Sequence, residues 1–314
     1  MGKHKEVIIC GMTRTEYAAK VRESLRPNPT YCNEHIKRKW LNIPYTNLPN
    51  SQMLDVYLPE TGDGPFPVVI YIHGGGFVRG SKDDHKSATI ALNGLDRGYA
   101  VVMMNYTLSL DASFPTQIHE VKAAIRWVKA NARDYHIDPA RIGLMGASAG
   151  AHLAALAGTS GTVGELEDKS LGNPEMDTVV QAVAVDFTPV NFATVNEQLL
   201  RLGREIPDGY NAPQYSSALY LGDLMEKVPE IVEQTNPETY ISPSSPPFFI
   251  QHGTEHYILP HDQSIHLAEL LVASIGEEKV ELSLLQGVGG GEDPNYFIQE
   301  NIMREFDFLD RFLK

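Results

Sequence analysis

The chain has 314 residues, of which 42% are hydrophobic, so it is long enough to bury one large core. Its formal net charge of −14 argues against nucleic acid and anionic membrane surfaces as partners, because like charges repel. The chain has two cysteines, Cys10 and Cys32, which are too few for a disulfide framework. Its start is charged, and it has no apolar run of about 20 residues that could span a membrane. Together these features predict a cytoplasmic protein without a membrane span.

The first third of the chain predicts one helix followed by three strands. Tyr17, Val21 and Leu25 recur at the spacing of one helical face, which predicts an amphipathic helix over 13–25. A continuous apolar run rich in β-branched residues predicts a strand buried on both faces. That strand is expected over Phe66–Ile72, after strands over Trp40–Tyr45 and Leu54–Leu58 that are joined by a turn at Asn47–Asn50.

From there strand and helix patterns alternate. Such alternation requires crossover connections and predicts an α/β fold with a mostly parallel sheet flanked by helices, which the antiparallel start makes mixed. The expected strands are Tyr99–Asn105, Ile142–Met145, Val179–Phe187, Pro247–Gln251 and Val280–Leu285, and the expected helices are Pro115–Asn131, Ala149–Ala157, Asp262–Ser274 and Asn295–Leu313.

One long segment interrupts this alternation. The residues from Asn191 to Pro246 have a helical pattern and are rich in Pro, Tyr and charge. An insertion of this kind between two strands predicts a small helical cap over the site at the end of the sheet. The alternative is a peripheral decoration.

The segment Gly146–Gly150 has the form G-x-S-x-G and lies between a predicted strand and an Ala-rich predicted helix. This is the setting of a nucleophile elbow, in which a sharp turn exposes the serine hydroxyl. A serine also needs a base for its proton and donors for the oxyanion that forms. The segment therefore predicts Ser148 as a nucleophile.

The segment His73–Phe77 reads His-Gly-Gly-Gly-Phe and directly follows another predicted strand. Glycine allows backbone N–H groups to face a substrate oxygen without a Cβ in the way. Because the carboxyl ends of parallel strands lie at one edge of the sheet, we expect this loop and the elbow to converge on one site.

These motifs, with Asn105-Tyr106 and His252-Gly253-Thr254, resemble the α/β-hydrolase fold of hormone-sensitive-lipase-like carboxylesterases and acetyl- and feruloyl-esterases, from about Trp40 onward. The resemblance implies hydrolysis of small carboxylic esters without a cofactor. It implies residues 1–37 as an N-terminal cap segment and 38–314 as the hydrolase domain, with 191–246 as the cap insertion. For the site it implies Ser148 as nucleophile and the N–H groups of Gly75, Gly76 and Ala149 as the oxyanion hole.

The chain departs from that family at several positions, two of them in the implied catalytic triad. His256 stands where the resemblance places the catalytic aspartate, and Gly290 stands where it places the catalytic histidine. No later histidine can replace it, because the last histidine of the chain is His266. Asp186 and Thr107 stand where relatives often have tryptophan and arginine.

Three interpretations follow. In the first, the triad is rearranged, with His256 as base and Asp186 as its orienting acid. In the second, the site has been remodelled by engineering, with His256 as nucleophile or base assisted by Asp186 or Glu255. In the third, the chain is a pseudoenzyme that binds ligands on the hydrolase fold. Phe77, Thr107 and Glu255 are the expected substrate-binding residues.

A metal site is not expected. Histidines and carboxylates are dense in this part of the chain, but they show no standard spacing of zinc ligands. The residues concerned are His252, Glu255, His256, His261, Asp262 and His266. The expected partner is a small-molecule ester, and the oligomeric state stays open, a homo-oligomer included.

Overall fold

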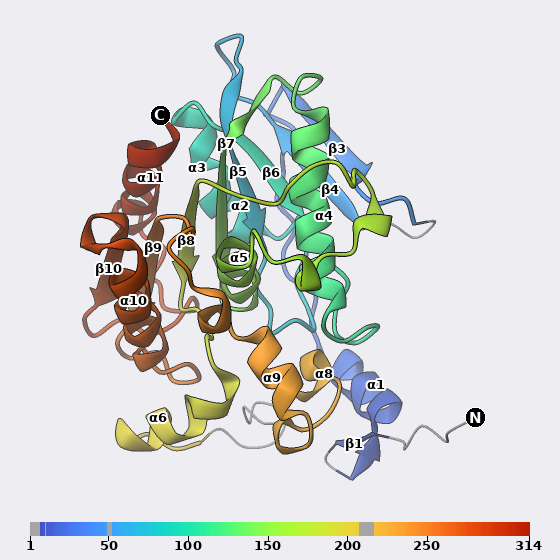
Figure 1. Ribbon diagram of the computed structural model, residues 1–314, viewed down its shortest axis with the longest axis vertical. Coiled ribbons are helices and arrows are strands. Elements are labelled where there is room, and N and C mark those ends of the chain that lie inside the picture. Colours follow the sequence, from blue (N-terminus) through green and yellow to red (C-terminus); the bar gives the residue numbers. More distant parts are fainter. Residues whose placement is uncertain (1–6, 10, 49–51, 207–216) are drawn as a thin grey trace.

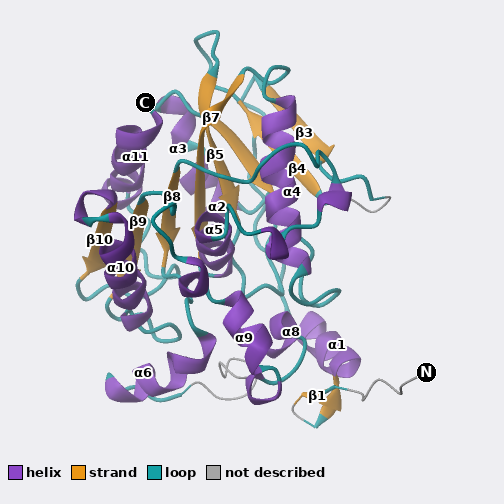
Figure 2. Ribbon diagram, viewed as in Figure 1, coloured by secondary structure: helices purple, strands orange, loops and turns teal. Residues whose placement is uncertain are grey.

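An eight-stranded mixed sheet forms the centre of the computed structural model, which describes residues 7–9, 11–48, 52–206 and 217–314 (Figures 1 and 2). The strand order is β10-β9-β8-β7-β5-β6-β4-β3, and only the β3–β4 and β4–β6 pairs are antiparallel. This confirms the predicted mixed, mostly parallel sheet. The strands are β3 (Lys39–Pro44), β4 (Met53–Tyr57), β5 (Phe66–Ile72), β6 (Ala100–Met104), β7 (Ile137–Ala147), β8 (Ala182–Asp186), β9 (Phe248–Gly253) and β10 (Val280–Leu285).

Two hydrophobic clusters cover the two faces of this sheet. Helices α4, α5 and α10 pack on one face, and α2 and α11 pack on the other. Residues along β8 alternate between the clusters, because successive side chains of a strand point to opposite faces. These helices are α2 (His85–Ala91), α4 (Thr116–Asn131), α5 (Ala149–Thr159), α10 (Asp262–Ile275) and α11 (Gln299–Leu313), with the short α3 (Asn93–Asp96) after α2.

Most predicted elements are confirmed with small shifts of their ends. Strand β7 differs most: it begins at Ile137, five residues before the predicted Ile142, because Ile137 pairs with Phe66 ahead of an irregularity in the register. The short helix α3 was not predicted. The predicted turn at Asn47–Asn50 lies partly outside the described residues, which leave out 49–51. Cys10 also lies outside the described residues.

Among the described helices, α1, α6, α8 and α9 gather at the end of the molecule where the carboxyl ends of the parallel strands lie (Figure 1). Helix α1 (Arg14–Ser24) confirms the predicted N-terminal helix and begins with a capping box between Thr13 and Glu16. Helices α6 (Val195–Arg201), α8 (Ala218–Leu221) and α9 (Pro229–Thr235) belong to the 191–246 segment. Tyr17 of α1 and Leu219 of α8 share one buried cluster, so the two segments are packed together.

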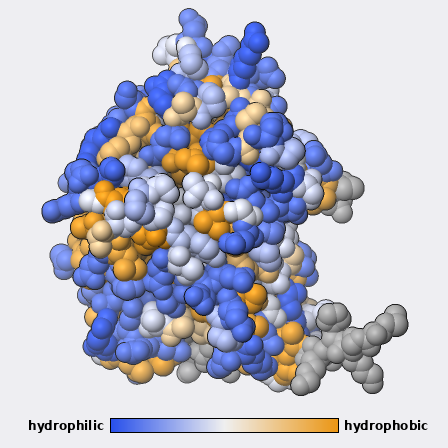
Figure 3. All heavy atoms as spheres, in the orientation of Figure 1, coloured by the Kyte–Doolittle hydropathy of each residue, from blue (hydrophilic) through white to orange (hydrophobic). Residues whose placement is uncertain are grey.

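The remaining elements are short. A two-stranded antiparallel hairpin, β1 (Ile8–Ile9) with β2 (Met12–Thr13), precedes α1. Hydrophilic side chains cover most of the face shown in Figure 3. None of the described helices is both long and apolar enough to cross a membrane. The 3₁₀ turns among the described residues are Gly164–Leu166, Lys169–Leu171, Phe192–Thr194, Met225–Lys227, Pro237–Tyr240 and Glu277–Lys279.

Candidate active site

Ser148 occupies a strained turn between β7 and α5. Its φ of 55° and ψ of −120° lie outside the regions that an L-residue usually adopts. The turn is close-packed: a Cβ at Gly150 would lie 2.0 Å from the carbonyl oxygen of Ile72, so only glycine fits there. The N–H of Ser148 donates to the carbonyl of Asp186 at 2.9 Å, which ties the turn to the end of β8. This local geometry is that of the predicted elbow.

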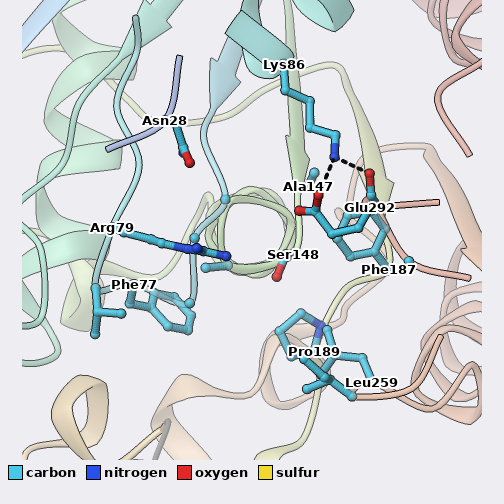
Figure 4. Close-up of a pocket in the computed structure, with 18 of the residues that line it drawn as sticks. Asn28, Phe77, Arg79, Lys86, Ala147, Ser148, Phe187, Pro189, Leu259 and Glu292 are labelled. Carbon is cyan, nitrogen blue, oxygen red and sulfur yellow. Dashed lines mark hydrogen bonds and ion pairs between the residues drawn. The ribbon is translucent and has the colours of Figure 1, made fainter. Parts of the chain in front are cut away.

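The Ser148 side chain is half-buried and points into a cavity (Figure 4). Within the described residues its Oγ forms no hydrogen bond. Among the described residues the hydroxyl therefore has no protein partner and is open to a bound molecule.

The glycine loop after β5 lies directly beside the elbow. A Cβ at Gly74 would lie 3.5 Å from Cβ of Ser148 and 2.7 Å from the carbonyl oxygen of Ala147. Gly75 and Gly76 have φ values of +116° and +61°, which favour glycine. The expected convergence of the two loops is thus present in the structure.

Three backbone N–H groups without a partner among the described residues belong to residues that line the same cavity as the hydroxyl. Among the described residues, the N–H groups of Gly75, Gly76 and Ala149 donate to no other group of the protein. Ala149 is the first residue of α5, so its N–H also lies at the positive end of that helix dipole. Unpaired N–H groups of this kind can stabilise negative charge on the oxygen of a bound molecule.

A cavity of about 900 Å³ joins these elements to the cap helices. Its lining includes Ser148, all three glycine-loop and elbow donors, and His256. Tyr17 and Val21 of α1 also line it, so the N-terminal helix forms part of the cavity wall. Of the three expected substrate-binding residues, only Phe77 lines the cavity.

The imidazole of His256 occupies the space beside Gly290. A Cβ at Gly290 would lie 2.6 Å from both Cδ2 and Nε2 of that ring. The histidine supplied by the loop after β9 therefore fills the space that a side chain on the loop after β10 would enter. Residues 256 and 290, where the sequence predicts departures from the family triad, are therefore direct neighbours.

Hydrogen bonds determine which nitrogen of His256 carries the proton. Its Nδ1 accepts the N–H groups of Ile258 at 3.3 Å and Leu259 at 3.1 Å, so the neutral ring holds its proton on Nε2. Burial, and then the charge of Arg204, lower the pKa of His256 to about 4. Arg204 also donates to the carbonyls of Thr254 and His256, which immobilises this loop.

The predicted pairing of Asp186 with His256 is wrong. The Asp186 carboxylate accepts from Nε2 of Gln251 at 3.2 Å and from the hydroxyl of Tyr296 at 3.1 Å, and it does not line the cavity. The cause is strand alternation: Val185 faces the α5 side of the sheet, so Asp186 faces the α11 side. Burial there raises the pKa of Asp186.

Thr107 and Glu255 are also not where the sequence suggested. The N–H and hydroxyl of Thr107 donate to Glu120 at 2.6 and 2.7 Å, so this residue ties the end of β6 to α4. Glu255 is exposed and lies 3.4 Å from Arg204. Neither lines the cavity.

The histidines weighed as metal ligands have separate partners. His252 contacts the hydroxyl of Ser264 at 2.7 Å, and His266 pairs with Glu238 at 2.9 Å. In the part of the chain that the structure describes, no three His, Cys, Asp or Glu side chains are grouped to hold a metal ion. His152, one turn after the serine, is buried between the carbonyl of Pro189 and the hydroxyl of Tyr220.

Arg79 is a cavity residue that sequence reasoning missed. It lies three residues after Gly76, and Figure 4 shows its side chain directed into the cavity toward Ser148. Its closeness to the glycine loop was the available signal, but an arginine in a turn is most often solvated. Lys86, the other cation of the lining, lies 3.7 Å from Glu292.

Comparison with known proteins gives consistent results. The family model described as BD-FAE matches residues 54–271. The esterase LipQ of Mycobacterium tuberculosis is 29% identical over 225 residues, which cover 71% of this chain and 50% of that protein. The chain spans about half the length of three curated esterase relatives that it matches.

Solved structures share the fold. A truncated carbohydrate esterase from gut microbiota superposes with a TM-score of 0.76 at 28% identity, covering 90% of this chain and 99% of that one. A bifunctional GH43-CE protein of Bacteroides eggerthii gives a TM-score of 0.75 at 30% identity, covering 87% of this chain and 35% of that one.

Proposed function

We propose, from the premise that the chain belongs to the BD-FAE family of α/β-hydrolase esterases, that it hydrolyses carboxylic esters of small molecules at Ser148. The observation that carries this proposal is the contact between the glycine loop and the elbow, 3.5 Å between Cβ of Ser148 and a Cβ placed on Gly74. It brings to one cavity a hydroxyl and N–H groups that have no partner in the described part of the chain.

The reaction proceeds in two steps. Oγ of Ser148 attacks the ester carbonyl carbon and loses its proton, and the carbonyl oxygen takes the negative charge. The N–H groups of Gly75, Gly76 and Ala149 bind that oxygen. The alcohol then leaves with a proton, and the acyl group stays on the serine as an acyl-serine. In the second step water hydrolyses this acyl-serine, which releases the acid and restores the hydroxyl.

His256 is the residue we propose as proton acceptor for Ser148, through Nε2. In the described arrangement Nε2 already carries the proton. To accept one, the ring must move its proton to Nδ1 and give up two hydrogen bonds from backbone N–H groups, each worth roughly 0.5–1.5 kcal/mol. The base is therefore available only at a cost, and turnover is slower than with a carboxylate-oriented histidine.

The two exchanged positions also bear on how this site arose. Histidine at 256 and glycine at 290 are mutually compatible, because the ring of His256 fills the space beside Gly290. We infer that the site was remodelled as a unit, whether naturally or by engineering. A natural gene that encodes this same chain would exclude engineering.

The cap completes the proposal. We propose residues 1–37 and 191–246 as cap segments of the 38–314 hydrolase domain. Their described parts support this, because Tyr17 and Val21 of the first segment and Phe192 and Val195 of the second line the cavity. Mostly apolar contacts on this side favour a small uncharged acyl or alcohol group next to the serine.

A second candidate is a protein that binds esters without turning them over. The tautomer of His256 favours it, since the described ring is a donor and not a base. The two candidates differ in turnover, so both are tested by the same assay.

The test is hydrolysis of 4-nitrophenyl acetate by the wild-type chain and by the Ser148→Ala and His256→Ala variants. Ester hydrolysis requires loss of activity in Ser148→Ala and a clear decrease in His256→Ala. Residual catalysis without a triad member is about 10³–10⁴-fold over water, so both variants are compared with buffer alone. Full activity in Ser148→Ala would contradict the proposal, and binding without turnover in the wild type would favour the second candidate.

A further inference from the structure

Among the residues that the structure describes, one cation of the cavity lining has no partner within the protein. Arg79 is exposed, and within the described residues its guanidinium forms no hydrogen bond or ion pair. Lys86, by contrast, donates to the carbonyl of Gly291 and lies 3.7 Å from Glu292. Arg79 is thus the cavity cation that is free to bind a ligand.

The carboxylates of the cavity have partners other than Arg79. Asp84 accepts from the amide of Asn28 at 2.8 Å and from the N–H of Ser81 at 3.1 Å. Asp293 accepts the N–H groups of Gly289 at 2.7 Å and Asn295 at 2.9 Å. Glu292 lies beside Lys86. These acids stabilise loops at the cavity wall and do not neutralise the guanidinium.

The position of Arg79 is set by the loop that carries the oxyanion donors. The carbonyl oxygen of Arg79 would lie 2.2 Å from a Cβ placed on Gly75. The N–H of Arg79 donates to the carbonyl of Gly75 at 3.1 Å. The backbone of Arg79 is therefore fixed relative to Gly75 and Gly76, and Figure 4 shows its side chain directed toward Ser148. A ligand placed for attack by the serine is within the region that this side chain faces.

We propose that Arg79 selects esters that carry a carboxylate elsewhere in the same molecule. A guanidinium binds a carboxylate through two parallel N–H···O hydrogen bonds, which a neutral group cannot reproduce. The inference deepens the proposed function, since it names the substrate class of the same site. The whole chain is acidic, so this attraction acts at short range and falls as salt is added.

The carboxylate can lie on either part of the ester, and matched probes separate the two cases. On the alcohol side the pair is 4-acetoxybenzoate and 4-acetoxybenzamide. On the acyl side it is monophenyl succinate and phenyl succinamate. Within each pair the molecules are nearly equal in size and differ in charge.

Binding is measured by calorimetry in the Ser148→Ala background, so that no turnover is needed. We expect one pair to show about tenfold tighter binding of the carboxylate than of the amide. Adding Arg79→Gln removes that preference, and adding Arg79→Lys keeps part of it, because the charge remains and the fork is lost. Arg133→Gln, at an exposed arginine outside the cavity lining, preserves it.

Equal binding of acid and amide in both pairs would overturn the proposal, as would a preference that survives Arg79→Gln. These results are independent of the esterase proposal. If the wild type hydrolyses 4-nitrophenyl acetate but shows no carboxylate preference, only the role of Arg79 fails. If the preference is present without any hydrolysis, the role of Arg79 stands and the hydrolase proposal fails.

Discussion

The carbonyl of Asp186 accepts a hydrogen bond from the N–H of Ser148 at 2.9 Å, while the side chain of Asp186 is buried on the face of the sheet that α11 covers. There it faces Glu305 of α11, whose two carboxylate oxygens have no hydrogen-bond partner among the described residues. The turn that holds the nucleophile therefore rests on a strand end that also carries a buried pair of acids. This pair couples the stability of the fold to pH.

Replacing Glu305 by glutamine is expected to stabilise the protein increasingly as pH rises. Burial, and then the charge of Asp186, raise the pKa of Glu305 well above its ordinary 4.5. The folded state thus holds a proton that the unfolded chain releases above about 4.5, so the wild type loses stability as pH rises toward the folded-state pKa. Glu305→Gln does not titrate and escapes this loss.

The measurement is the melting temperature of wild type and Glu305→Gln between pH 5 and pH 9. The difference should be small at pH 5 and grow with pH. Glu269→Gln, at an exposed glutamate on α10, serves as the control and should show no such trend. A pH-independent difference for Glu305→Gln would show that the buried acid does not titrate as described.

Gly150→Ala is expected to destabilise the chain, although alanine is normally better than glycine in a helix. The added methyl would lie 2.0 Å from the carbonyl oxygen of Ile72, which forces the elbow away from β5. Overpacking of this kind costs about 1–3 kcal/mol. Gly164→Ala is the matched control, because nothing lies within 4 Å of its Cβ. Urea denaturation of both variants checks the prediction, and equal stability would contradict it.

Moving the histidine to position 290 is expected to increase ester hydrolysis. In the double variant His256→Asp with Gly290→His, the ring that blocks residue 290 is removed and a carboxylate takes its place. A histidine oriented by a carboxylate can hold the tautomer that accepts the serine proton, and general base catalysis contributes about 10²–10⁴-fold.

Neither single variant should show this gain. Gly290→His alone brings Cβ within 2.6 Å of the His256 ring, and His256→Asp alone removes the imidazole. The readout is kcat for 4-nitrophenyl acetate, with His256→Ala plus Gly290→His as the control that lacks the carboxylate. A double variant no better than the two single variants would mean that residue 290 does not face Ser148.

The ring of His256 is expected to stay neutral, with its proton on Nε2, across the neutral pH range. Its pKa is lowered to about 4 by burial and by the charge of Arg204. Nitrogen-15 NMR of the imidazole should show an unprotonated Nδ1 at pH 7, with resonances assigned by their loss in His256→Gln. A ring that titrates near 6.5, or that carries its proton on Nδ1, would contradict the described hydrogen bonds.

The same depressed pKa predicts the direction of acid lability. Below about pH 6.5 the unfolded chain binds a proton at residue 256 that the folded chain refuses until about pH 4. Stability should therefore decrease as pH falls from 6.5 to 4, and His256→Gln should reduce that slope. An unchanged slope in this variant would assign the acid lability to the other buried histidines, His152 among them, whose pKa is also lowered to about 4.

Much of the fold could be predicted because its signals are local. The strand Phe66–Ile72 was predicted to the residue, since an unbroken apolar run can satisfy burial on both faces of a parallel sheet. The elbow at Ser148 was predictable for a similar reason: G-x-S-x-G between a strand and a helix describes a turn that depends on neighbouring residues. The proposed site residues on the glycine loop and elbow belong to this local class.

The errors concern contacts between distant parts of the chain. Asp186 was placed beside His256 because both lie near strand ends, but the face to which a strand residue points depends on how the sheet is covered. Thr107 was expected in the cavity, and Glu120 on α4 binds it instead. Arg79 was missed because nothing in the sequence shows that its guanidinium lacks a partner.

The amino-acid order by itself determined the sequence of strands and helices and the two glycine turns at their ends, because backbone conformation responds to residues a few positions away. Only the folded chain decided that the ring of His256 fills the space beside Gly290 and which of its nitrogens holds the proton. Those outcomes depend on where two loops, separated by an entire helix and strand, come to rest. Their relative position is set by the packing of the whole sheet.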